Sequence, residues 1–244
     1  MNKTQLGLLF YFTVVLSSTA HSQGSLGELA IDQTATETIR AATTNEAYLT
    51  RWVDSLPEHP TIPSPRDVLG YTIGTPGELT QVDEIYHYFN ALAEASDRVE
   101  VFQLGQSFEG RDMLVVAIAD AQHLQNINTY SSYLEALSDP RLTDAEQAGA
   151  IIEQALPIFW MTAGLHSPEL GPPEMVMELA YRLAVETREP FTTIRQNVLT
   201  LITPVFEVDG RTRQVEWFKR NIKGHTDYFN MPPRSVPFWG HYTY

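Results

Sequence analysis

The chain has 244 residues, of which 43% are hydrophobic and 11% aromatic, so it is long enough and apolar enough to fold around a sizeable core. Its formal net charge is −14, and a surface of that sign repels phosphate backbones, which argues against a nucleic-acid partner. It contains no cysteine, which excludes disulfides, a thiolate nucleophile and a thiolate metal site. Any metal held by this chain must therefore be bound by His, Asp, Glu or water.

Residues 1–22 have the features of a secretory signal. Lys3 gives a positive start, residues 6–16 are apolar but too short to span a bilayer comfortably, and a small-residue cleavage site ends at Ser22. A membrane-anchored N-terminus is the alternative interpretation of the same pattern. Because no later stretch is apolar enough for a transmembrane helix, we predict a secreted or periplasmic protein with no membrane contact after signal cleavage.

The segment that follows the signal shows little periodicity until residue 80. Residues 24–44 are rich in Ser, Thr, Ala and Gly and predict a loose lead-in, and residues 45–56 predict a short helix. The four prolines of residues 57–65 predict an extended connector. Apolar residues at helical spacing then predict a helix over residues 80–96, with Thr80 as its N-cap.

Strand and helix patterns alternate over the rest of the chain to residue 203. Runs of β-branched and aromatic residues predict four strands, at 99–104, 113–119, 158–162 and 198–203, the first two joined as a hairpin and the last two buried. Helices are predicted at 122–137, 143–155, 174–186 and 191–196. Buried strands alternating with helices are typical of an α/β layered domain.

Two metal-ligating side chains follow the third strand. His166 and Glu169 lie on the loop between this strand and a helix that the prolines Pro172 and Pro173 begin. Imidazole nitrogen and carboxylate oxygen both suit zinc, and two such groups three residues apart at a strand end can share one ion. Because a loop with a polar His and Glu is also common in α/β proteins that bind no metal, this pair alone is a weak signal.

The order of three segments strengthens the signal for a metal site. Residues 104–120 contain Gly-x-Ser-x-Glu-Gly-Arg, residues 157–174 contain a strand followed by Gly-x-His-x-x-Glu, and residues 200–211 contain a strand followed by Pro-x-x-x-x-Asp-Gly. In this order they resemble the zinc carboxypeptidase family, the carboxypeptidase A-like metallopeptidases. The resemblance implies a three-layer helix/sheet/helix α/β fold with a mixed sheet that is C-terminally incomplete.

The resemblance also implies an activity and a cofactor. It implies Zn²⁺ held by His166 and Glu169, and hydrolysis of the C-terminal bond of a peptide or protein substrate by zinc-activated water. Members of the family use a second His as third ligand, and His225 and His241 are the candidates here, although both come earlier than the family pattern expects. For the Arg that steadies the oxyanion beside the metal, Arg220 and Arg234 both lie in roughly the right region, and the sequence does not choose between them.

Several parts of the family site have no counterpart in the sequence. No general base Glu and no Asn-Arg pair for the substrate carboxylate follow before residue 244. We therefore expect a truncated, inactive fragment with a signal at 1–22, a lead-in and connector at 23–64, and the N-terminal portion of the catalytic domain at 65–244. Pro168 stands where the family often has Arg, and the usual Asn-Pro-Asp-Gly is Glu-Val-Asp-Gly at 207–210.

Two other functions share the same features. Aspartoacylase-like and succinylglutamate desuccinylase-like hydrolases also carry His-x-x-Glu, and a non-catalytic binding protein could keep the fold. The Glu-Gly-Arg hairpin and the Asp-Gly segment favour the peptidase. Residues 211–244 are dense in aromatic and basic side chains without clear periodicity, and we predict a long loop there that lines a binding cleft.

Overall fold

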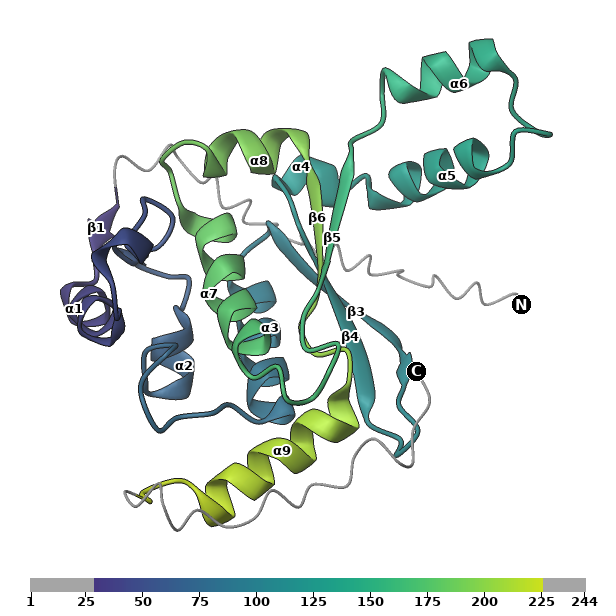
Figure 1. Ribbon diagram of the computed structural model, residues 1–244. Helices are drawn as coiled ribbons and strands as arrows, with labels where there is room; N and C mark the ends of the chain where they lie inside the picture. The colour runs from purple at the N-terminus through teal and green to yellow at the C-terminus, as the bar shows by residue number, and fades with distance from the viewer. Residues whose placement is uncertain (1–28, 226–244) are drawn as a thin grey trace, which may run out of the picture.

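The computed structural model describes residues 29–225 (Figure 1). The predicted signal, the candidates Arg234 and His241, and the aromatic residues from Tyr228 onward lie outside the described residues. Among the helices that the structure does describe, none is both long and apolar enough to cross a membrane.

A four-stranded mixed sheet forms the centre of the molecule, in the order β3-β4-β6-β5 (Figure 1). β3 (Val99–Gln106) and β4 (Asp112–Ile118) form an antiparallel hairpin, and β4 also pairs antiparallel with β6 (Leu199–Thr203). β5 (Ile158–Thr162) pairs with β6 in parallel. The predicted α/β class, the mixed sheet and its four strands are thus confirmed.

The register of β5 and β6 fixes where the loops that follow them lie. Thr162, the last residue of β5, pairs with Thr203, the last residue of β6. Two parallel strands that end level bring their following loops side by side, and the backbone joins them directly. The Ala163 amide donates to the Thr203 carbonyl at 2.9 Å, and the Glu207 amide donates to the Gly164 carbonyl at 3.1 Å. The loops after the two strands are therefore one connected unit.

Two long helices cover one face of the sheet. α3 (Val82–Ala95) and α7 (Gly171–Val185) bury apolar side chains against strand residues such as Val116 and Ile202 (Figure 1). α3 begins two residues later than predicted, because Gln81 and Glu84 form its capping box in place of Thr80. α8 (Phe191–Asn197) then leads from α7 to β6, so that β5, two helices and β6 make one crossover unit.

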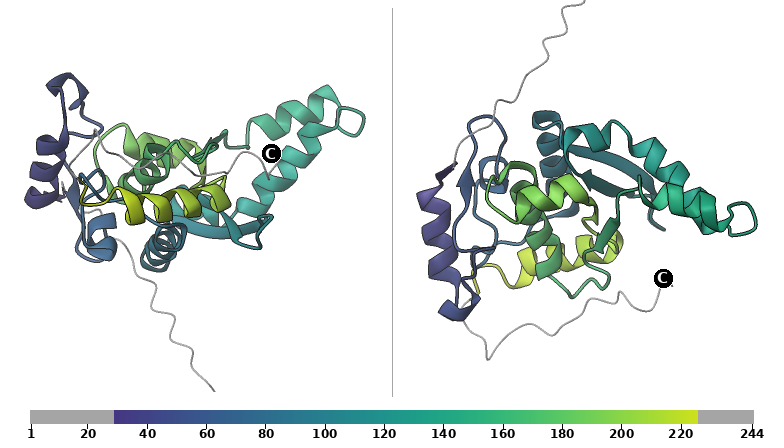
Figure 2. Two further views of the ribbon diagram at one scale, coloured as in Figure 1. Left: turned by 60° about the horizontal axis from the view of Figure 1, so that its bottom comes forward. Right: turned by 90° about the horizontal axis from the view of Figure 1, so that it is seen from above.

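The other face of the sheet carries a smaller layer of helices. α4 (Ala121–Leu124) and the start of α5 (Ile127–Ser138) pack on small residues of β4 and on β6. α5 and α6 (Ala145–Ile152) have no buried residue and project from the body as an arm (Figure 2). The three-layer arrangement is present, but little of the second helical layer covers the sheet.

The burial predicted for β5 is wrong. β5 is an edge strand, and two of its large side chains, Phe159 and Trp160, are 58% and 56% exposed. A short run of β-branched and aromatic residues is as compatible with an edge as with a centre, because propensity does not say how many strands lie alongside.

The N-terminal lead-in contains more structure than its composition predicts. It includes a two-stranded pairing of β1 with β2, a ten-residue helix that Asp32 caps, and only one 3-10 turn where a short helix was expected. The elements are β1 (Ala30–Ile31), α1 (Gln33–Ala42), η1 (Glu46–Tyr48), β2 (Pro57–Glu58) and α2 (Pro65–Leu69). The expectation of a loose segment over residues 24–44 is therefore wrong from residue 30 onward.

The loop expected from residue 211 is also partly wrong. A helix, α9 (Val208–Asn221), occupies the first part of this segment. Its N-cap residue is Glu207, whose side chain accepts a hydrogen bond from the Gly210 amide. Its buried face is mainly polar, with Arg211 and Gln214 beside Val215, so apolar periodicity could not reveal the helix.

Candidate metal centre

The loop between β5 and α7 carries both predicted ligands. It turns at Gly164, whose φ of +59° lies in the left-handed region that favours glycine. A Cβ at this position would also lie 2.9 Å from Cγ of Pro173, so the loop passes close to the first turn of α7. These two constraints bring the chain back over the carboxyl ends of β5 and β6.

The side chains of His166 and Glu169 meet on this loop. His166 Nδ1 lies 2.9 Å from Oε1 of Glu169, and the His166 amide donates to Oε2 of Glu169 at 3.2 Å. The hydrogen bond from the imidazole is the main reason that the pKa of Glu169 lies below its ordinary value. The two side chains are 42% and 48% exposed, so a ligand or ion could reach them from solvent.

The spacing of the two atoms is shorter than that of two ligands of one zinc ion. Two ligand atoms that each lie 2.0–2.2 Å from a tetrahedral zinc ion are roughly 3.3–3.6 Å from each other. The observed 2.9 Å between Nδ1 and Oε1 is that of a hydrogen bond, and a modest separation of the two side chains would admit an ion. One neutral nitrogen and one carboxylate oxygen are ligand types that zinc accepts.

His225 and Arg220 are the other predicted site residues in the part of the chain that the structure describes. Within residues 29–225, no group of three or more His, Asp or Glu side chains could hold a metal ion, so His225 is not grouped with His166 and Glu169. Arg220 is exposed on the last turn of α9.

The start of α9 fastens the loop beside His166. Ser167, the residue after His166, is buried and donates its hydroxyl hydrogen to Oε2 of Glu207 at 3.0 Å. Gly210 lies directly against it, since a Cβ at Gly210 would be 2.3 Å from Oγ of Ser167 and 2.7 Å from its Cβ. Only a residue without a side chain lets the two segments approach this closely.

Asp209 joins α9 to the turn of the β3–β4 hairpin. Its buried carboxylate accepts from the Ser107 hydroxyl at 2.8 Å, from the Glu109 amide at 3.1 Å and from Arg111 Nη1 at 2.6 Å. The Gly-x-Ser-x-Glu-Gly-Arg and Asp-Gly segments are therefore in direct contact. Glu109 and Arg111 bond to each other and hold this turn, in accord with a structural rather than a chemical role.

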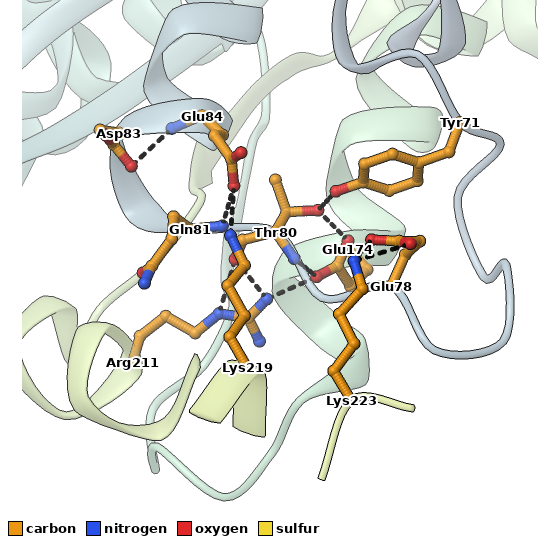
Figure 3. A network of polar contacts seen from close by, with 10 residues as sticks. All are labelled: Tyr71, Glu78, Thr80, Gln81, Asp83, Glu84, Glu174, Arg211, Lys219 and Lys223. Carbon is orange, nitrogen blue, oxygen red and sulfur yellow. Dashed lines mark hydrogen bonds and ion pairs between the residues drawn. The ribbon is translucent and has the colours of Figure 1, made fainter. Parts of the chain in front are cut away.

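Arg211 fastens the other end of the loop, and Figure 3 shows its contacts with Thr80 and Glu174. Its buried guanidinium donates to the Leu170 carbonyl at 3.0 Å, to the Thr80 carbonyl at 2.8 Å and to Oε1 of Glu174 at 2.5 Å. Glu174 in turn accepts from the Thr80 amide and hydroxyl, and the Tyr71 hydroxyl lies 2.6 Å from that hydroxyl. Burial raises the pKa of Tyr71 to about 12, so its hydroxyl stays protonated beside the carboxylate.

The zinc carboxypeptidase family model matches residues 85–228, which is more than half of the chain. The chain belongs to the zinc carboxypeptidase family. The match includes His166 and Glu169, both contacting segments of the hairpin and α9, and the whole sheet. The search of curated proteins found no match.

Solved structures of carboxypeptidases resemble this member of the zinc carboxypeptidase family over part of their length. Bovine thrombin-activatable fibrinolysis inhibitor, in complex with tick carboxypeptidase inhibitor, is 16% identical with a TM-score of 0.38 and 59% of this chain covered. Carboxypeptidase A from Helicoverpa armigera is 22% identical with a TM-score of 0.40 and 58% covered. A second structure of thrombin-activatable fibrinolysis inhibitor is 18% identical, with a TM-score of 0.40 and 72% covered. The chain spans 35%, 27% and 32% of these three structures, respectively.

The sequence did not reveal the residues that hold the site together. Glu174 and Arg211 were not singled out, and Thr80 was predicted only as a helix cap, although the three meet behind the loop. One signal was available: a glutamate, an aspartate and an arginine alternate at 207, 209 and 211, directly after a buried strand. Charged residues at that position need buried partners, and the partners are the segments on either side of the metal-ligand pair.

Proposed function

We propose that His166 and Glu169 are two ligands of a catalytic zinc ion and that the protein is a metallocarboxypeptidase, which hydrolyses the C-terminal bond of a peptide or protein. The observation that carries this proposal is the meeting of His166 Nδ1 and Glu169 Oε1 at 2.9 Å on a loop at the carboxyl ends of two parallel strands. Membership of the zinc carboxypeptidase family supports the choice of zinc and of peptide hydrolysis.

The two side chains have complementary tasks. His166 offers an aromatic nitrogen, and Glu169 offers a carboxylate oxygen, whose pKa the hydrogen bond from His166 lowers further below neutral pH. A proton that lies between them must leave before an ion takes its place, which makes metal binding depend on pH. When bound, zinc supplies Lewis-acid chemistry, activating water and polarising a carbonyl. The exposure of both side chains leaves room for substrate.

Two ligands alone hold zinc weakly, since a catalytic site normally has three from the protein. The third ligand in this proposal is a further histidine, with His225 and His241 as candidates, and the oxyanion is steadied by Arg220 or Arg234. We assign no general base within the chain. We therefore expect the 244-residue chain by itself to bind zinc weakly and to hydrolyse no peptide.

The test is an assay of the purified chain with added zinc on two substrate classes, peptides with a free C-terminus and N-acyl amino acids. The chain is expected to release nothing from either class, and chelator-sensitive release of the terminal residue of the peptide would show that a further group, such as His225 or His241, completes the site. Release from N-acyl amino acids only would favour the aspartoacylase-like alternative.

We also propose that the protein is exported, on the charge, apolar run and cleavage site of residues 1–22. Expression in a bacterium followed by fractionation and N-terminal sequencing tests this. A mature N-terminus near Gln23 outside the cytoplasm is expected, and an intact Met1 in the membrane fraction would favour the anchored alternative.

A further inference from the structure

We infer that Glu207 and Arg211 are positioning residues, which hold the loop so that His166 and Glu169 meet at one point. This inference rests on the proposed metal site, and it concerns groups that do not touch the metal themselves. Both residues lie within five consecutive positions at the start of α9, and each contacts the residue that directly follows one of the two ligands.

The first contact fixes the loop after His166. Ser167 is buried, and its hydroxyl donates to Oε2 of Glu207 at 3.0 Å, while Oε1 of Glu207 accepts from the Gly210 amide at 3.1 Å. The Glu207 carboxylate is thus tied on one oxygen to its own helix and on the other to the loop. A rotation of the loop about His166 would break the bond to Ser167.

The second contact fixes the loop after Glu169. Arg211 Nη1 donates to the Leu170 carbonyl, and the rest of the same guanidinium is held by the Thr80 carbonyl and the Glu174 carboxylate (Figure 3). The planar fork of arginine can serve these acceptors at once, which a lysine ammonium cannot do in the same geometry. Because Arg211 is buried and Glu174 is tied to Thr80, the guanidinium has little freedom to follow a displaced loop.

The contact with Leu170 also involves α7. Leu170 is the N-cap residue of α7, so the Arg211 guanidinium holds the residue at which this helix begins. The ion pair of Glu174 with Arg211 therefore does two things, since it places an acidic residue in the first turn of α7 and holds the carbonyl just before that turn. The position of Glu169 relative to α7 follows from this arrangement.

The experiment compares Arg211→Gln and Glu207→Gln with Lys219→Gln in the full chain. Lys219 is a matched control, because it is a cation on the same helix whose exposed ion pair with Glu84 does not touch the loop. Two quantities are measured: the zinc dissociation constant, by competition with a chelating dye, and the hydrogen exchange of backbone amides in the metal-free protein. Circular dichroism confirms that each variant is folded.

We expect zinc affinity to fall on the order of tenfold in Arg211→Gln and in Glu207→Gln, as it does when outer-shell partners of a metal site are removed. Lys219→Gln should remain within twofold of the wild type. In the metal-free protein, the Glu169 and Glu207 amides, which donate to His166 and Gly164, should exchange at least about tenfold faster in the two variants. Amides in the β3–β4 hairpin should keep their rates, which separates a local release from global unfolding.

Arg211→Lys tests whether a positive charge alone is enough to hold the loop. It should keep a partner for Glu174 but lose the bond to Leu170, so its zinc affinity should stay below that of the wild type. The inference is overturned if folded Arg211→Gln and Glu207→Gln bind zinc as the wild type does, whatever their exchange rates. If the wild type itself binds no zinc, the proposed metal site fails. Exchange at Glu169 and Glu207 then decides the inference, and unchanged rates overturn it.

Discussion

At the scale of single residues, the closest contact behind the metal loop involves Gly210. A Cβ at this position would lie 1.7 Å from Oε2 of Glu207, 2.3 Å from Oγ of Ser167 and 2.7 Å from Cβ of Ser167, and the Ser167 Cβ cannot withdraw without moving the loop that carries His166. We expect Gly210→Ala to lower the free energy of unfolding by about 1–3 kcal/mol, the usual cost of overpacking.

Gly149→Ala is the matched control. Gly149 lies in α6 with no atom within 4 Å of a Cβ, so alanine should raise the free energy of unfolding by about 0.5–1 kcal/mol through helix propensity. Urea unfolding of both variants measures the difference. Equal effects of the two substitutions would show that the close approach of Gly210 to Ser167 and Glu207 does not constrain the chain.

Asp209 is the second residue whose environment leads to a prediction. Its buried carboxylate accepts three hydrogen bonds from the hairpin turn, including one from the Arg111 guanidinium. Asp209→Asn keeps the shape but removes the charge, and we expect a loss of about 1.5–3 kcal/mol in the free energy of unfolding. Asp139→Asn, which breaks an exposed pair with Arg141, should change stability little, and an equal loss there would contradict the account.

At the scale of elements, the end of α7 depends on a buried carboxylate. Burial alone would raise the pKa of Glu186, but hydrogen bonds from Arg188 and from the Thr187 amide outweigh it, so the pKa lies below its ordinary value. A group whose pKa is lower in the folded state contributes stability above its unfolded pKa and loses that contribution as the pH falls through its folded pKa.

We therefore expect Glu186→Gln to cost roughly 1–2 kcal/mol of unfolding free energy near pH 7. The cost should shrink as the pH falls below the ordinary titration range of a glutamate, where the wild-type carboxylate becomes protonated. Chemical unfolding of both proteins between pH 3 and pH 7 measures it, with Glu153→Gln on the exposed arm as control. A difference between Glu186→Gln and the wild type that does not change with pH would contradict this assignment.

The elements that the sequence predicted well are those with strong local patterns. All four strands and α3 follow from runs or spacings of apolar residues, and the structure changes their ends by at most two residues. α9 was missed because its buried positions include Asp209, Arg211 and Gln214, which read as surface residues until their partners are known. The edge position of β5 was missed because strand order is set by tertiary contacts.

In the candidate site, too, local patterns were predictable and tertiary contacts were not. His166 and Glu169 could be found because they are three residues apart and bond within one loop. The contacts behind them join residues up to 131 positions apart, as between Arg211 and Thr80, and no local pattern encodes such a pairing. The sequence therefore predicted the two ligands but not what holds them.

At the scale of the whole molecule, β5 forms an unpaired edge of the described sheet. Within the described part of the chain it has a strand partner only in β6, and Phe159 and Trp160 are more than half exposed. Exposed strand edges pair with other chains unless a charge blocks them. We expect the purified chain to self-associate as its concentration rises, and Phe159→Lys to reduce that association.

Sedimentation velocity over a range of concentrations measures the effect. Phe108→Lys is the control, because Phe108 is 85% exposed at the hairpin turn, away from this edge. The wild type and Phe108→Lys should form larger species at concentrations where Phe159→Lys is still monomeric. A wild type that stays monomeric throughout, or equal effects of the two lysines, would contradict the role of the β5 edge.

The central claim is that His166 and Glu169 share one zinc ion, and calorimetric titration of zinc into metal-free protein tests it most directly. The wild type should bind one zinc ion weakly, with release of heat that is lost in both His166→Ala and Glu169→Gln and kept in Lys219→Gln. Binding should also weaken as the pH is lowered, because protons compete for the imidazole and the carboxylate. Zinc binding that survives unchanged in His166→Ala, or no binding by the wild type, would contradict the account.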